Sequence, residues 1–168
     1  MADTLNMVAD TEDVARILRR NWVVDGILQH YAFDMRRNET YISVNRPAVT
    51  SYADDVRTFV ESHPDFCFGS DESAYMRALI NVESIRKSEF FIGDVKLNID
   101  VEVEPRDVFT KSHAGIFTRY DGKTIKANEM MKIEPIKDEV SSDAIMLEVR
   151  SRLLDISKLE TCCLDTNE

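Results

Sequence analysis

The sequence predicts an α+β protein with a mainly antiparallel or mixed sheet packed by about three helices in a single domain. Residues 95–104 alternate strictly between apolar and polar side chains, which is typical of a strand with one buried face. Segments 11–20, 52–62 and 142–157 instead carry apolar residues at helical spacing. Because strands and helices do not alternate regularly along the chain, an antiparallel sheet is favoured over a doubly wound parallel one.

The length supports one domain over residues 1–168. The 168 residues, of which 43% are hydrophobic, suffice to bury a core without a disulfide or a metal. No internal repeat, low-complexity tract or linker divides the chain. Weak patterning at the two ends predicts frayed segments at about 1–9 and 160–168.

The first third of the chain predicts a helix followed by a hairpin. Asp10 is suited to cap a helix over 11–20. Residues 27–33 and 40–46 are strand candidates, the second because it is rich in β-branched and aromatic side chains. A polar connection joins these two segments, so we expect them to pair with each other.

Capping and turn residues divide the rest of the chain. Ser51 precedes one predicted helix and Ser142 begins another. Asp121-Gly122 is a strong hairpin signal, and Asp25-Gly26 is a further turn signal. The elements expected in this region are a helix over 52–62, strands over 75–85, 95–104 and 113–120, a return strand over 123–127 and a helix over 142–157.

Acidic side chains outnumber basic ones by 31 to 21, which gives a formal net charge of −10. This balance argues against general nucleic-acid binding and against docking on anionic lipid. No apolar run is long enough to span a membrane, and no secretory signal begins the chain. The three cysteines do not form a disulfide framework, so we expect a cytoplasmic location; the role of the adjacent Cys162 and Cys163 stays open.

No linear catalytic signature is present. Phosphate-binding glycine loops, the G-x-S-x-G serine elbow and the H-E-x-x-H zinc motif are all absent. His30, His63 and His113 fall in different predicted elements, and Cys162-Cys163 lacks the spacing of metal ligands. We therefore expect neither a metal nor a cofactor.

His113 is the first candidate for chemistry. It begins a predicted strand and precedes Ala114 and Gly115, whose small size lets a ligand or another backbone approach. A histidine in such a place can act as a general acid or base near neutral pH. The structural alternative is that His113 satisfies a buried carbonyl while Gly115 permits tight packing.

The second candidate is a cluster of arginine, serine and asparagine over residues 36–46. Arginine beside asparagine can bind phosphate or carboxylate in a forked geometry. We interpret Ser43 and Asn45 as catalytic candidates together with His113. The ligand-binding candidates are Arg36, Arg37 and Arg46. The alternative is a solvated turn followed by an ordinary strand with one polar face.

Arginines also surround the single tryptophan. Arg16, Arg19 and Arg20 would lie in the last turns of the predicted helix over 11–20, where the helix dipole favours cations. We expect a solvated cationic face there. Trp22 is expected to anchor this helix in the core, although an Arg–Trp stack would also suit recognition of a base or a partner surface.

Two short segments resemble those of a set of small bacterial proteins to which no reaction is assigned. That set carries an F-x-L-R-x-x-E-x-x-L-S-V-N-type segment and a later S-H-A-x-I segment. The matching residues are Phe33, Arg36, Glu39, Ser43, Val44 and Asn45 in the first segment, and Ser112, His113, Ala114 and Ile116 in the second. Met35 stands where the set often has Leu, and Arg46-Pro47 replaces a more usual Trp-Leu. The resemblance implies a bacterial cytoplasmic protein and joins Asn45 and His113 as candidates.

Two functional hypotheses follow. The first is an accessory protein that binds a protein partner, since catalytic motifs are absent and an acidic chain favours a basic partner. The second is a small enzyme or ligand-binding domain for a phosphate-containing substrate, with His113 as acid or base and the cluster over 36–46 as its anion and positioning residues. The second requires His113 to face a common pocket with that cluster, within about 10 Å of it.

Overall fold

A computed structural model describes residues 7–36, 38–69, 73–103, 111–133, 136 and 138–164. The chain folds around an eight-stranded sheet with the strand order β12-β5-β1-β4-β8-β7-β6, and β9 adds to β8. All of these strand pairs are antiparallel, so the α+β class with a mainly antiparallel sheet is confirmed. The strands of this sheet are β1 (Asp13–Ile17), β4 (Ile42–Asn45), β5 (Ala74–Asn81), β6 (Phe90–Ile92), β7 (Val95–Val103), β8 (His113–Tyr120), β9 (Lys123–Thr124) and β12 (Ser157–Cys163).

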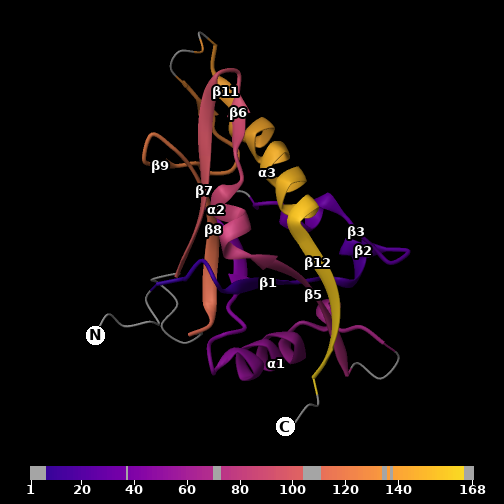
Figure 1. The fold of residues 1–168 in the computed structure, drawn as a ribbon. Coiled ribbons are helices and arrows are strands. Elements are labelled where there is room, and N and C mark those ends of the chain that lie inside the picture. Colours follow the sequence, from indigo (N-terminus) through magenta and orange to yellow (C-terminus); the bar gives the residue numbers. More distant parts are fainter. Residues whose placement is uncertain are drawn as a thin grey trace.

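Helices cover both faces of the sheet (Figure 1). Within the described residues the helices are α1 (Tyr52–Ser62), α2 (Val82–Lys87) and α3 (Ser142–Ile156). Helices α2 and α3 pack on the face that carries the larger core, where α2 contacts β7 and α3 contacts β5 and β6. Helix α1 packs on the opposite face against a smaller apolar cluster that includes Ala15 and Ile17 of β1.

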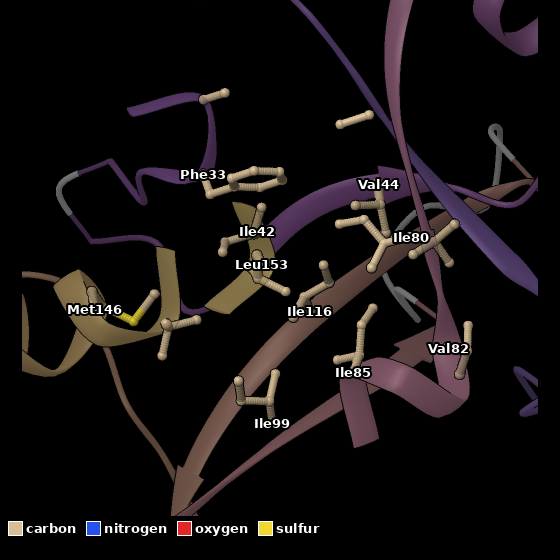
Figure 2. Packing of buried hydrophobic residues seen from close by; sticks show 14 of the residues in the cluster. Phe33, Ile42, Val44, Ile80, Val82, Ile85, Ile99, Ile116, Met146 and Leu153 are labelled. Atoms are coloured by element: carbon tan, nitrogen blue, oxygen red, sulfur yellow. The ribbon is translucent and has the colours of Figure 1, made fainter. Parts of the chain in front are cut away.

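The larger core explains why the strands alternate (Figure 2). Val44 and Ile116 project from β4 and β8 toward α2 and α3, and Ile80 joins them from β5. Leu153 and Met146 cover these side chains from α3. Burial of apolar side chains on one face leaves the alternate positions of β4 and β8 on the other face, toward α1. Ser43, Asn45 and His113 occupy such positions.

The two Asp-Gly turn signals are confirmed. Asp25 and Gly26 both have positive φ angles, of 51° and 77°, and connect β2 (Val23–Val24) to β3 (Ile27–Leu28). Asp121-Gly122 has the same geometry, with φ angles of 47° and 74°, between β8 and β9. This pair of angles is what a type I′ turn requires. A further hairpin pairs β10 (Met130–Met131) with β11 (Val140–Ser141).

The expected helix over 11–20 is wrong, because Asp13–Ile17 forms strand β1 between β4 and β5. Val14 and Ala15 are both fully buried, on opposite faces of the sheet. A strand at the middle of a sheet buries both faces, and its sequence then loses the alternation that would identify it. The apolar spacing that suggested a helix arises from this burial on two sides.

The hairpin expected between residues 27–33 and 40–46 is also wrong. His30–Phe33 forms a 3-10 helix instead, and β4 pairs with β1 and β8. The expected helices over 52–62 and 142–157 match α1 and α3 closely.

The strand expected over 75–85 stops earlier. Asn81 ends β5 and caps α2, since its side-chain oxygen accepts a hydrogen bond from the backbone N–H of Ser84 at 3.1 Å.

The C-terminal segment differs from the expected frayed tail beginning near residue 160. Strand β12 pairs with β5 along seven residues, from Ser157 opposite Ile80 to Cys163 opposite Ala74. Arg77 donates to Glu160 across this pair at 3.0 Å. Among the helices that the structure describes, none is both long and apolar enough to cross a membrane.

Candidate functional site

The two segments that carry the resemblance contribute β4 and β8, which pair side by side in the sheet. In the β4–β8 register, Asn45 is opposite His113 and Ser43 is opposite Gly115. Ser43 Oγ lies 2.5 Å from His113 Nε2, a hydrogen bond between residues 70 positions apart. Antiparallel pairing places opposite residues on the same face of the sheet, so Ser43, Asn45 and His113 converge on one side.

A second hydrogen-bond network fixes the side chain of Asn45. Its Nδ2 donates to Ser112 Oγ at 3.0 Å, and the Ser112 hydroxyl in turn donates to Asp55 Oδ2 of α1 at 2.6 Å. The same carboxylate oxygen accepts from the Ser112 N–H at 3.1 Å and from the Ser51 hydroxyl at 2.9 Å. These bonds hold the Asn45 amide in one orientation and tie α1 to the start of β8.

The sheet opens beside these residues, and an arginine occupies the opening. Within the described residues, β1 and β4 pair at a single position, Ala15 opposite Asn45. Beyond it, Arg16 Nη1 donates to the Ser43 carbonyl at 2.7 Å and Arg16 Nε donates to the Ala32 carbonyl at 3.1 Å. Arg16 therefore satisfies a β4 carbonyl that a longer β1–β4 ladder would have bonded.

A pocket of about 980 Å³ lies over this opening, between the sheet and α1. Ser43, Asn45 and His113 line it from β4 and β8. Helix α1 contributes the face formed by residues 55, 58, 59 and 62, whose spacing places them on one side of a helix. The adjacent face of α1, with Tyr52, Val56 and Val60, is buried against the sheet, which fixes the orientation of the helix.

Three arginines line the pocket: Arg16, Arg19 and Arg36. Burial is the main cause that lowers the pKa of Arg16 to about 10; Glu39 opposes this change. The neighbouring charges of Arg36 and Arg19 lower the same pKa further. A crowded, partly desolvated guanidinium is stabilised when an anion approaches it.

Arg19 is held by aromatic rings rather than by a carboxylate. Its guanidinium carbon lies 5.7 Å from the Trp22 ring centroid and 5.2 Å from that of Phe66. Arg19 Nε is buried and has no hydrogen-bond partner in the part of the chain that the structure describes. A buried donor without a partner in this position is suited to a bound acceptor.

Each acidic residue in the pocket wall already has a donor. Asp34 accepts from Arg150 of α3, and Glu39 Oε2 accepts from the backbone N–H of Arg36 at 2.6 Å. Asp55 is held by the serine network described above. Their charges are thus partly compensated, whereas the Arg19 side chain forms no ion pair among the described residues.

Arg46, expected to bind a ligand, has a structural role instead. It is 3% exposed, and its Nε and Nη2 each donate at 2.9 Å to one oxygen of the Glu12 carboxylate. Its Nη2 also donates to the Met7 carbonyl at 3.1 Å. Arg46 is not part of the pocket wall, because it follows Asn45 and projects to the other face of the sheet. Arg37 lies outside the described residues.

Close packing around Gly115 positions the Tyr41 ring beside His113. A Cβ at Gly115 would lie 2.7 Å from Tyr41 Cδ2 and 2.9 Å from Phe117 Cε2. Tyr41 lies edge to face with His113, with ring centroids 6.0 Å apart. The small residue after His113 therefore admits a neighbouring tyrosine, which is the close approach that the sequence suggested in general form.

The structure brings Arg36, Ser43, Asn45 and His113 to one pocket and excludes Arg46. The pocket and its supporting network also include residues that no sequence pattern marks as site residues: Arg16, Arg19, Asp55 and Ser112. The sequence predicts a solvated helix face for both arginines, whereas Arg16 lies in β1 and Arg19 lies between β1 and the 3-10 helix Arg20–Trp22. Local sequence indicates only that Asp55 lies in a helix, because its contact with Ser112 spans 57 positions.

Neither a metal site nor a disulfide forms within the described residues. No group of three histidine, cysteine, aspartate or glutamate side chains there is arranged to hold a metal ion. Cys67 is buried, Cys162 is half-buried and Cys163 is exposed, and all are free thiols. No family model matches the sequence, and no curated protein or solved structure is significantly similar to it.

Proposed function

We propose that this protein is a small enzyme that binds a phosphate-containing molecule in the pocket between α1 and the sheet, with His113 as its acid–base group. The observation that carries the proposal is the Ser43–His113 hydrogen bond of 2.5 Å, in the wall of a pocket also lined by Arg16, Arg19 and Arg36. Histidine beside a hydroxyl provides proton transfer, and guanidinium groups provide anion binding.

Each residue of the pocket has a role that follows from its position. Arg16 and Arg19 hold the phosphate, because Arg16 contacts the Ser43 backbone and Arg19 retains an unsatisfied buried donor. Arg36 is more exposed and supplies charge at the rim. Asn45, fixed by Ser112, orients the ligand near His113. His113 exchanges a proton with the reacting hydroxyl, either that of Ser43 or one on the ligand.

A binding experiment tests the first half of this proposal. Ribose 5-phosphate is titrated calorimetrically into the wild-type chain, Arg16→Met and Arg19→Met. We expect binding to the wild type and at least a tenfold loss in each variant, since a charge-assisted contact contributes about 1.5–3 kcal/mol. Arg152→Met is the matched control, because Arg152 is exposed on α3 away from the pocket. Absence of binding to the folded wild type, or equal losses in the control, overturns the proposal.

A reaction assay tests the second half. Release of inorganic phosphate from phosphate esters is followed for the wild type and His113→Asn. We expect turnover by the wild type and its loss in the variant, with ligand binding retained. Binding without turnover for every ester assigns the pocket to a ligand-binding domain and contradicts the role of His113 as an acid–base group.

The competing role, an accessory protein for a protein partner, would use the edge strands β6 or β12. Neither edge strand lines the pocket in which the Ser43–His113 hydrogen bond and the three arginines lie, so the small-molecule role is the one proposed. The free thiols and the resemblance to small bacterial proteins support a bacterial cytoplasmic location as part of the same proposal.

A further inference from the structure

One end of the pocket, beside its arginines, is lined by the aromatic residues Trp22, Phe59 and Phe66. We propose that the occupant of the pocket is a nucleotide, a phosphate ester that carries a planar heterocyclic base. This inference rests on the proposed function, which supplies the phosphate contact. It adds the chemical class of the remainder of the ligand, and it comes from aromatic residues that the acid–base chemistry does not use.

Phe59 offers a stacking surface in the pocket wall. It keeps 37% of its surface exposed although it is a large apolar side chain. It stacks on His63 with ring centroids 4.5 Å apart and an angle of 25° between the planes. Phe66 meets it edge to face at 4.7 Å and holds the ring in place. A rigid, partly exposed aromatic ring is the kind of platform on which bases stack.

The cationic and aromatic parts of the pocket are continuous. Arg16 and Arg19 both lie over the Trp22 ring, at 5.0 Å and 5.7 Å from its centroid. Trp22 in turn meets Phe66 edge to face at 6.0 Å. A ligand with a phosphate and a ring joined by a short linker contacts both parts at once, whereas inorganic phosphate leaves the aromatic end unused.

Polar side chains also line the pocket beside Trp22, Phe59 and Phe66. They are Asn21, Thr58 and Ser62. The Asn21 amide and the Thr58 hydroxyl are groups of the kind that pair with base edges, whereas the Ser62 hydroxyl already donates to the Thr58 carbonyl at 2.8 Å. The pocket volume of about 980 Å³ lies at the upper end of the range for small-molecule sites, about 300–1,000 Å³, so it accommodates a mononucleotide.

A single nucleotide suits the charge of the protein better than a nucleic-acid strand. The chain has a net charge of −10. A polymer would extend further phosphates beyond the pocket over a protein that is acidic as a whole, which disfavours its binding. One phosphate held by Arg16 and Arg19 avoids this unfavourable interaction.

The test compares ligands that differ in one part. Adenosine 5′-monophosphate, ribose 5-phosphate and a single-stranded oligonucleotide are each titrated into the wild-type chain by calorimetry. We expect the nucleotide to bind at least tenfold more tightly than ribose 5-phosphate, as base stacking on an aromatic side chain predicts. Equal affinity for these two overturns the inference and leaves the proposed function standing. Binding by neither contradicts both, and tighter binding of the oligonucleotide assigns the site to a polymer and overturns the inference.

Substitution of two exposed phenylalanines tests where in the pocket the base binds. Phe59→Leu keeps an apolar side chain but removes the ring, so it should lower the affinity for the nucleotide to about that for ribose 5-phosphate. Phe91→Leu is the matched control, because Phe91 is also exposed, at 53%, but lies on β6 outside the pocket wall. Circular dichroism confirms that both variants fold. If Phe59→Leu retains the nucleotide preference, the base does not stack there and the inference fails.

Discussion

His113 Nε2 and Ser43 Oγ are joined by a hydrogen bond of 2.5 Å across the β4–β8 register, although they are 70 residues apart in the chain. Neither residue belongs to a linear catalytic motif. They meet because each follows the alternation of its strand onto the face that α1 covers. This pair, the Arg46–Glu12 ion pair and the packing at Gly115 each have consequences that can be measured.

The Ser43–His113 pair should be energetically coupled. Ser43→Ala, His113→Asn and the double variant form a cycle whose unfolding free energies are obtained from urea titrations. We expect a coupling free energy of about 1 kcal/mol, typical of one hydrogen bond between partly exposed groups. Strictly additive effects would show that the two side chains do not interact in solution.

Arg46→Met should destabilise the fold by about 3–5 kcal/mol, because it leaves the Glu12 carboxylate largely buried without its partner. Combining it with Glu12→Gln should recover a large part of that loss, since the uncompensated charge is then gone. Chemical denaturation provides the measurement. A loss in Arg46→Met as small as that of an exposed arginine, such as Arg152→Met, would contradict the structural role assigned to Arg46.

Glu12 should contribute to acid sensitivity. Burial raises its pKa, but the hydrogen bonds from Arg46 and the Ala9 N–H outweigh burial, and the pKa falls below 4.5 in the folded state. A lowered folded-state pKa stabilises the protein above the unfolded-state pKa, and this contribution disappears as the pH falls through the folded value. Thermal unfolding of Glu12→Gln should therefore vary less with pH below about 4.5 than the wild type. Parallel pH profiles for the two proteins would refute this role.

Gly115→Ala should destabilise the protein by about 1–3 kcal/mol, as overpacking usually does. The added methyl group meets the Tyr41 and Phe117 rings within 3 Å. Tyr41→Leu should relieve part of this strain in the double variant, because a smaller side chain leaves space above Gly115. The His113 ring signals in an NMR spectrum should shift in Gly115→Ala, since Tyr41 contacts that ring. An unshifted His113 spectrum together with unchanged stability would contradict the packing described.

Local patterns in the sequence determined several elements. Two Asp-Gly turns require positive φ angles at successive residues, and both adopt them. Helices α1 and α3 match their predicted ranges because each has one buried face and so retains helical periodicity. Residue type and the small residues after His113 indicate His113 and the polar residues of β4 as candidates, and the pocket contains Ser43, Asn45 and His113.

Only the tertiary structure decided which residues meet. Strand β1 is buried on both faces between β4 and β5, so its apolar spacing resembles that of a helix and predicts a solvated position for Arg16. Arg16 enters the pocket because β1 and β4 diverge after one pair, which no local signal encodes. Arg46, chemically equivalent to Arg16, is buried against Glu12 instead. Residue type sets what a side chain can do, whereas long-range strand pairing sets which face it occupies and which groups it reaches.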